Sequence, residues 1–250
     1  MSLKKAFSLA EVLITLGLIG IVAAMTIPVL FSNINNAKFR NQFKKSISTL
    51  NQAALMAQAQ YEYNFAGTSE KCPSDKATAA SQHPDEHMTF CAILNGTLTG
   101  HTYQGRVGDL QRVERGQNVG TYTLVKKDTI KDDYLNYLSY SLADGVLVAF
   151  DPNAAGCELS IGNRLQQALF SGPVGGNDLS HCMGFIDVNG VTLPNTEVSC
   201  TMGTNKVDAG SGCIVTNNSG RLSDVFPVVF HDSTVEPASG AAMYILDSTK

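Results

Sequence analysis

The stretch KKAFSLAEVLITLGLIGIVAAMTIPVLF, residues 4–31, determines how this chain of 250 residues is placed in the cell. After its two lysines, Glu11 is the only ionisable side chain, and no charge follows from Val12 to Ala37. A helix of about 20 apolar residues crosses the hydrocarbon core of a bilayer. Residues 7–31 are therefore predicted to form a membrane-spanning helix, with the lysines on the cytoplasmic side and the rest of the chain outside.

Glu11 is a residue that a simple membrane tether does not need. A carboxylate inside a membrane span is unfavourable, and such residues usually have a function. Alternatively, Glu11 lies shallow, at the level of the headgroups, and is simply solvated. Phe7 stands four residues before it and follows the small residue Ala6. A cut between Ala6 and Phe7 would place a new ammonium group about one helical turn from the carboxylate, where the two charges could pair within one chain or between two.

The segment from Lys4 to Glu11 (KKAFSLAE) with the apolar run behind it resembles the prepilin cleavage motif of bacterial type IV pilins and type II secretion pseudopilins. The resemblance implies that a prepilin peptidase removes residues 1–6 as a leader and N-methylates the new terminal Phe7. It also implies that Glu11 recruits the Phe7 amine of a neighbouring subunit during assembly. Most members carry Gly before the cut, and Ala6 stands there in this chain, so we expect slower processing.

The same resemblance implies the surroundings of the protein. Its partners would be other pilin or pseudopilin subunits, the prepilin peptidase and an inner-membrane assembly platform. The chain would begin as a single-pass precursor in the bacterial inner membrane and end in a periplasmic or extracellular filament. Gly17, Gly20 and Pro28 would form the region of the helix that stretches or loses helicity in the filament. Proline in a helix interior also predicts a bend near Pro28 without reference to any family.

An ordinary secretory signal peptide is the main alternative for the N-terminal segment. Val22-Ala23-Ala24 resembles a small-residue cleavage site after a hydrophobic region, and the mature chain would then begin at Met25. Glu11 inside the apolar region argues against this interpretation, and so does the uncharged stretch that continues beyond Ala24.

Residues 32–65 are predicted to continue the helix as an amphipathic segment that packs against the head. Apolar residues recur there at spacings of three and four, which is the period of one helix face. The helix would run from Phe7 to about Tyr63, a length of roughly 85 Å, and Gly67 with the residues after it would end it. The apolar stripe consists of Phe39, Phe43, Ile47, Leu50, Ala54, Ala57 and Tyr61.

Residues 66–250 are predicted to form one exported globular head with short strands, so that the whole chain belongs to the α+β class, with the long helix packed on an antiparallel sheet. Ala143-Asp144-Gly145 between two apolar runs predicts a β-hairpin. Pro227 predicts that its strand is interrupted or lies at the edge of the sheet. The predicted strands are residues 121–125, 134–142, 146–151, 185–188, 225–230 and 243–246.

All six cysteines lie beyond residue 71, in the predicted exported part. An even number in an oxidising compartment indicates disulfides, and the absence of a C-x-x-C pair makes a zinc site the lesser interpretation. Six cysteines allow 15 pairings, among which the sequence does not choose. As a working hypothesis we pair neighbours in the sequence, namely Cys72–Cys91, Cys157–Cys182 and Cys200–Cys213.

Few other residues suggest a ligand. Asp187 and Asn189 offer oxygen atoms to calcium, which some secretion pseudopilins bind, but a full ligand set is missing and a structural turn is favoured. His83 and His87 match H-x-x-E-H, yet Pro84 between them does not fit the helix that a zinc protease needs. The glycine-rich residues 171–176 lack a phosphate-binding pattern. No cofactor and no enzymatic activity are expected, and the net charge of −4 argues against binding to nucleic acid.

Three functions remain to be compared. The first is a structural subunit of a type IV pilus or type II secretion pseudopilus, assembled through its N-terminal helix. The second is a scarce subunit at the filament tip, whose head binds a surface or a secreted substrate, and its low abundance in sheared filaments would distinguish it. The third is a secreted metal-dependent hydrolase that uses His83 and His87, for which the zinc content of the protein would be decisive.

Overall fold

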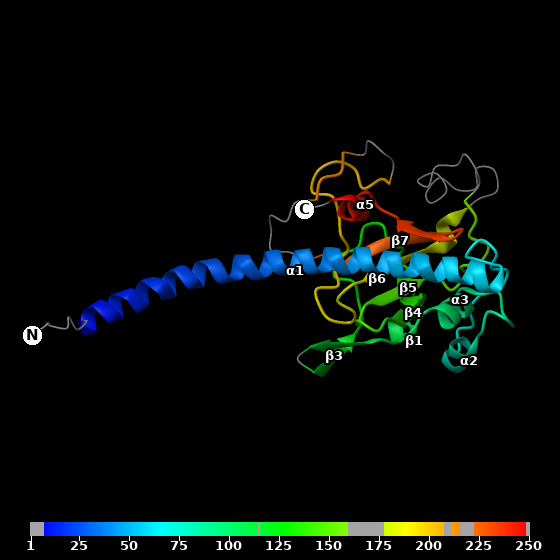
Figure 1. Cartoon of the computed structure of the whole chain (residues 1–250), viewed down its shortest axis with the longest axis horizontal. Helices are drawn as coiled ribbons and strands as arrows, with labels where there is room; N and C mark the ends of the chain where they lie inside the picture. Colours follow the sequence, from blue (N-terminus) through cyan, green and yellow to red (C-terminus); the bar gives the residue numbers. More distant parts are fainter. Residues whose placement is uncertain (1–7, 115, 160–177, 208–211, 216–222, 249–250) are drawn as a thin grey trace, which may run out of the picture.

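The computed structural model describes residues 8–114, 116–159, 178–207, 212–215 and 223–248. It has the predicted α+β architecture, in which one long helix, α1, lies along a head built on an antiparallel sheet and extends far beyond it (Figure 1). The helices are α1 (Leu9–Tyr61), α2 (Lys76–Ser81), α3 (Phe90–Thr97) and α5 (Gly240–Asp247).

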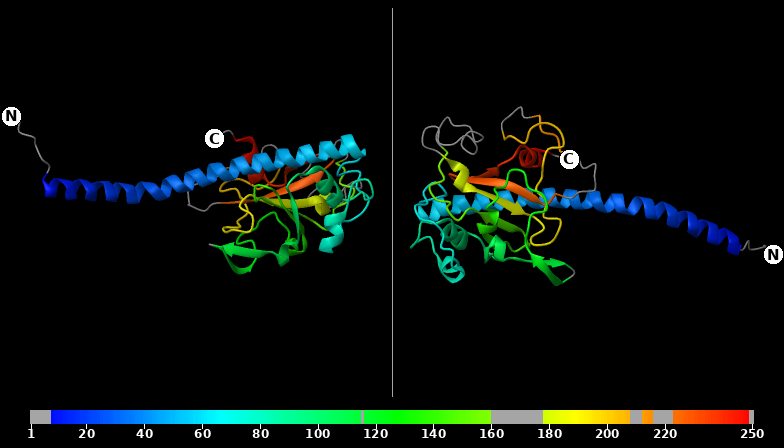
Figure 2. Two further views of the ribbon diagram at one scale, coloured as in Figure 1. Left: turned by 60° about the horizontal axis from the view of Figure 1, so that its bottom comes forward. Right: turned by 180° about the vertical axis from the view of Figure 1, so that it is seen from behind.

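Helix α1 has 53 residues, which corresponds to a length of about 80 Å. It ends at Tyr61, where Glu62 adopts a left-handed conformation with φ 64°. The end therefore comes slightly before the predicted one, and Gly67 is not needed to stop the helix. The helix remains continuous across Pro28, and its N-terminal half curves gently instead of breaking (Figures 1 and 2).

The predicted apolar stripe of α1 faces the head. Its residues from Phe39 to Ala57 are buried, whereas Lys38, Lys45 and Gln52 on other faces are exposed. The Phe43 ring stacks on the Phe226 ring at 4.2 Å between centroids, which joins the helix to the sheet. Period-3.6 patterning thus predicted this interface correctly, because a helix can bury such a stripe only against another element.

The main sheet has six antiparallel strands in the order β1-β4-β5-β6-β7-β8. The predicted hairpin is confirmed, since β4 pairs with β5 around Asp144 and Gly145, the latter with φ 85°. The strands predicted at 185–188 and 225–230 are confirmed as β6 and β7. The bounds are β1 (Thr102–Arg106), β4 (Leu138–Ser141), β5 (Leu147–Phe150), β6 (Met183–Asp187), β7 (Val225–His231) and β8 (Thr234–Pro237).

The prediction that the strand of Pro227 lies at the sheet edge or is interrupted is wrong. Strand β7 pairs along its length with β6 and also with β8, which is the edge strand. The proline, which has no N–H to donate, is tolerated because the pairing between β7 and β8 covers only Val228 to His231 and does not include Pro227. The Pro227 carbonyl still accepts a bond from the Ala238 N–H at 2.9 Å.

Two other predicted strands are also wrong. Residues 243–246 belong to α5, which Ser239 caps by accepting the Ala242 N–H at 3.1 Å and which buries Ala241, Ala242 and Ile245. Residues 122–125 are not a strand, because the strand ends at Thr121 as part of a separate hairpin formed by β2 (Gln111–Glu114) and β3 (Gln117–Thr121). The first part of the predicted strand at 134–142 is a 3-10 turn, Tyr134–Asn136.

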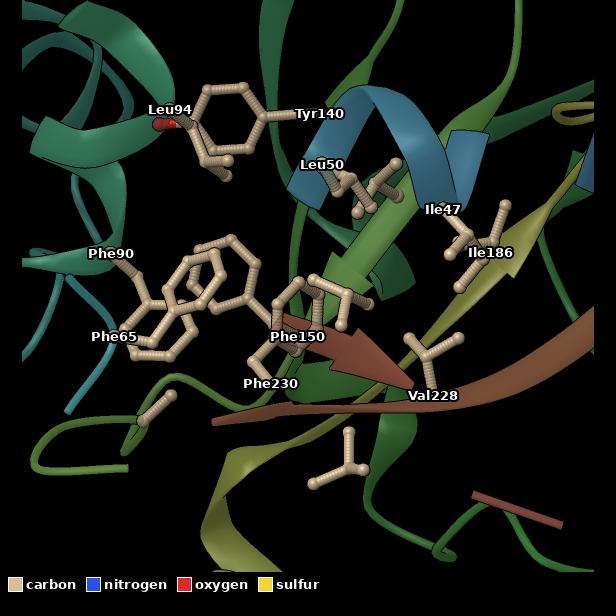
Figure 3. Packing of buried hydrophobic residues seen from close by; sticks show 14 of the residues in the cluster. Ile47, Leu50, Phe65, Phe90, Leu94, Tyr140, Phe150, Ile186, Val228 and Phe230 are labelled. Carbon is tan, nitrogen blue, oxygen red and sulfur yellow. The ribbon is translucent and has the colours of Figure 1, made fainter. Parts of the chain in front are cut away.

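The sheet is covered on both faces, which explains why its central strands are almost entirely buried. Val148 and Ile186 belong to the larger core, which includes the buried residues of α1. Figure 3 shows Ile186 next to Ile47 of α1. Leu147 and Phe185, their neighbours along the strands, point to a second core that residues 107–137 complete. Four phenylalanine rings with centroids 4.8–6.3 Å apart form the centre of the larger core, namely Phe65, Phe90, Phe150 and Phe230.

Gly184 in β6 is a position where we expect a strong effect of a small change. A Cβ atom there would lie 2.2 Å from the Ala149 carbonyl oxygen and 2.8 Å from the Phe230 ring. Because the first of these atoms belongs to the backbone of a paired strand, Gly184→Ala should lower the free energy of unfolding by about 3 kcal/mol or more. Urea unfolding of the full chain in detergent measures this change, and an unchanged midpoint would contradict it.

Three disulfides pair the cysteines as neighbours in the sequence, which confirms the working hypothesis. Cys72–Cys91 joins the segment after α1 to α3, Cys157–Cys182 joins the segment after β5 to the start of β6, and Cys200–Cys213 closes a loop before β7. Each bridge restricts the unfolded chain and so stabilises the head, by typically 2–4 kcal/mol.

Candidate functional site: the protruding apolar helix

The apolar segment at the start of α1 is not buried by any other described part of the chain. Residues Leu9–Ile27 form 19 helical residues that are long and apolar enough to cross a membrane, and none of this segment is buried inside the protein. All the views in Figures 1 and 2 show this segment extending beyond the head. The same helix becomes part of the core from Phe39 onward, so the apolar segment is a continuous extension of the head.

Glu11 caps the start of this helix together with Ser8. A Glu11 carboxylate oxygen accepts the Ser8 N–H at 2.8 Å and the Ser8 hydroxyl at 3.0 Å, while the Glu11 N–H donates to that hydroxyl. The carboxylate thus reaches back to the residue next to Phe7, although Ala6 and Phe7 themselves lie outside the described residues. Sequence analysis missed Ser8, although the spacing S-x-x-E just before an apolar run is the signal of a capping box.

The other side chains of the segment suit an apolar environment. The hydroxyls of Thr15 and Thr26 donate to the carbonyl oxygens of Val12 and Val22 at 3.0 Å, so they need no external partner. A Cβ atom at Gly17 or Gly20 would meet nothing within 4 Å, so no packing within the described part of the chain requires glycine there. Small residues allow helices to approach closely in lipid, and these two positions are free to serve that purpose.

Lysines fix the helix where it leaves the head. Lys44 donates to the Ser248 carbonyl at 2.6 Å, at the C-terminal end of α5, where a positive charge is favourable. Lys45 pairs with Asp144 in the β4–β5 turn at 2.9 Å. Together with the buried stripe, these two contacts hold the docked half of α1 on the head and so orient the projecting segment.

The side chain of Asp187, a calcium candidate from the sequence, forms hydrogen bonds inside the head. Its side chain is fully buried, and its two oxygens accept the Tyr122 hydroxyl at 2.7 Å and the Asn189 N–H at 3.0 Å. Burial, and then the charge of Asp224, raise the pKa of Asp187 well above its usual range. The Asn189 amide donates to the carbonyls of Thr192 and Leu193, so both residues build the turn after β6, as the favoured interpretation states.

Asp224 gives the head a pH dependence. Burial raises the pKa of Asp224 to about 6, although its oxygens accept the N–H groups of Thr196 and Asn195. A carboxyl group with a raised folded pKa stabilises the fold below its unfolded pKa and loses this contribution as pH rises through the folded pKa. We expect the stability advantage of the native chain over Asp224→Asn to fall by up to about 1.4 kcal/mol per pH unit from roughly pH 4 to about 6.

Urea unfolding of both chains across this range measures the difference between them. The variant lacks the Asp224 carboxyl group, so the pH dependence of the stability difference reports the titration of Asp224 together with the effect of its charge on Asp187. A stability difference that stays constant with pH would contradict the prediction.

The histidine pattern does not form a metal site in the described part of the chain. His83 and His87 lie in a turn, not on a helix, and they contact different carboxylates, Asp85 at 3.1 Å and Glu70 at 3.8 Å. Cys157, His181 and Cys182 do have ligand atoms within 4.8 Å of one another, but the two cysteines form a disulfide and His181 contacts the Ala155 carbonyl. The glycine-rich residues 171–176 lie outside the described residues.

Comparison with protein-family models, with curated proteins and with solved structures finds no match to this chain. Its function is therefore inferred from its own residues and their geometry.

Proposed function

We propose that this protein is a structural subunit of a type IV pilus or a type II secretion pseudopilus. The observation that supports this most is the apolar segment Leu9–Ile27, which no other described part of the chain buries and which continues directly into the core helix of the head. Such a surface is stable only in lipid or against other apolar helices. A subunit that moves from the membrane into a filament meets both environments in turn.

The continuity of α1 distinguishes an assembly element from a tether. A tether can be joined to its domain by any flexible linker, whereas here one helix supplies both the apolar extension and the stripe from Phe39 to Ala57 that the sheet covers. Packing of the extensions in a filament would therefore also set the position of every head. This favours a protein whose heads form an ordered outer surface.

Glu11 supports the same proposal. In the filament interior a carboxylate is costly unless an opposite charge neutralises it. The amine of Phe7, once the leader is removed, is the nearest source of such a charge. The capping bonds with Ser8 already direct the carboxylate toward that end of the chain.

Mass analysis of the N-terminus of membrane-extracted protein tests the proposal. We expect a chain that begins at Phe7 and carries one additional methyl group. A chain that begins at Met25 would show a secretory signal peptide instead, and an uncut chain that begins at Met1 would exclude prepilin processing. Either of these results would overturn the proposal.

A further inference from the structure

Several large apolar side chains of the head are exposed to solvent. Outside α1, the most exposed large apolar residues of the described chain are Val125 and Met202, at 67% and 64% of their full exposure. Ile214, exposed to 42%, pairs with Met202 through a backbone bond at 3.0 Å. We call these three residues the basal patch.

The segments that carry the basal patch are held together by polar bonds. Lys126 donates to the Ser199 hydroxyl at 2.8 Å, and the Asn205 amide donates to Asp128 at 3.0 Å. The disulfide between Cys200 and Cys213 closes the loop that contains Met202. The patch is therefore a fixed part of the surface, built from segments far apart in the sequence.

The patch lies at the end of the head from which the apolar helix projects. The Asn205 carbonyl accepts the Gly240 N–H at the start of α5 at 3.3 Å, and Ser248, which caps the end of α5, accepts a bond from Lys44 of α1. Figures 1 and 2 show the β2–β3 hairpin and the loop at residues 190–200 at this same end. Helix α3, by contrast, lies at the other end, where α1 finishes.

The length of the helix places this end near a membrane surface. If the span ends at residue 31, as the sequence predicts, the exposed Lys38 lies seven residues further, or roughly 10 Å along the helix. The headgroup layer on each side of a bilayer is about 5–8 Å thick, and a lysine side chain can reach several ångströms back toward it. Lys126 and Lys206, which flank the patch in the sequence, are exposed as well.

We propose that the basal patch rests in the headgroup layer of an anionic phospholipid bilayer while the subunit is still unassembled. Exposed apolar side chains combined with lysines are the chemistry that binds such an interface. The contact would hold the head close to the membrane and limit the tilt of α1 before extraction. The proposal rests on the membrane anchoring that the proposed function includes.

A tryptophan reporter tests the contact, because the chain contains no tryptophan. Full-length Val125→Trp is placed in nanodiscs of phosphatidylglycerol whose acyl chains carry bromine near the headgroup. The matched control is Leu55→Trp. Leu55 lies on the docked half of α1, on the face that points away from the head, and is exposed to 58%. We expect several-fold stronger quenching at position 125 than at position 55. Equal quenching at the two positions overturns the proposal.

Variants that reverse the charge of a lysine test whether the bound lipid is anionic. In the Val125→Trp background, Lys206→Glu should weaken the quenching, whereas Lys71→Glu, an exposed lysine next to Cys72, should leave it unchanged. Quenching that is the same in phosphatidylcholine, or that both variants leave unchanged, overturns the role of anionic lipid. A change of emission that depends on protein concentration in detergent, without quenching in nanodiscs, indicates a second copy and overturns the lipid contact.

Failure of this inference can be separated from failure of the proposed function. Resistance of the nanodisc-bound chain to extraction by alkaline carbonate shows that the span is inserted. An inserted span without quenching at position 125 refutes only the surface contact. If quenching at position 125 is as expected but the mature chain is not cut before Phe7, only the filament assignment is refuted.

Discussion

Glu11→Gln is expected to leave membrane insertion intact and to reduce the yield of sheared filaments about tenfold or more. Glutamine keeps the side-chain acceptor of the capping box, so the helix still begins at the same residue. The substitution removes only the charge. Inside a filament the Phe7 ammonium group would then be buried without a partner, and a buried charge that loses its partner is strongly destabilising. Immunoblotting of sheared and membrane fractions measures both outcomes.

Ser8→Ala is the matched control for the Glu11 variant. It removes the hydroxyl that caps the helix and keeps the carboxylate. Loss of such a cap costs about 1 kcal/mol of helix stability, which a 53-residue helix tolerates. We therefore expect filaments from this variant. If Glu11→Gln assembled normally, or if Ser8→Ala failed to the same degree, the charge of Glu11 would have no special role in assembly.

Phe43→Ala is expected to produce the largest loss of stability among substitutions on α1, about 3–5 kcal/mol. The Phe43 side chain is fully buried, and its ring stacks on Phe226 with an interplanar angle of 15°. Truncation removes this contact and leaves a cavity between helix and sheet, which the rigid sheet cannot close. Urea unfolding of the full chain in detergent micelles, followed by circular dichroism, measures the change in free energy of unfolding.

Leu55→Ala on the same helix is the control for Phe43→Ala. Leu55 is exposed to 58%, so its truncation should change the free energy of unfolding by less than about 0.5 kcal/mol. Comparable losses at the two positions would mean that α1 does not dock on the sheet through its apolar stripe. Because the docked half of α1 carries the projecting half, we also expect Phe43→Ala to yield fewer filaments.

Local patterns in the sequence predicted those elements whose burial follows a regular period. The stripe from Phe39 to Ala57 and the hairpin around Asp144-Gly145 are examples, because the helix period and the turn preference act over a few residues. The apolar residues 243–246 were assigned to a strand, since a short apolar run fits either structure. The cap from Ser239 and the burial of Ala241 and Ala242 against the rest of the head make this segment a helix.

Elements with weak local patterns were not predicted. Strands β1 and β8 are short, and although their burial alternates, Gly105 and Pro237 at buried positions are not residues that indicate a strand. Helix α3 has only 8 residues, and Phe90 and the disulfide-bonded Cys91 anchor it in the core, so its apolar run is too short to reveal a period. In each case long-range packing, not local propensity, selects the structure.

The sequence by itself determined the apolar segment, the single carboxylate within it and the stripe that joins the helix to a head, because length, charge and period are local properties of the chain. Only the tertiary structure decided which cysteines pair, that Asp187 serves a buried turn, and that Val125 and Met202 come to the same end of the head. These features depend on contacts between segments far apart in the chain, and no local pattern encodes such distances. The Ser8–Glu11 cap depends on both the sequence and the structure. Its spacing is visible in the sequence, and its geometry in the structure directs the carboxylate toward Phe7.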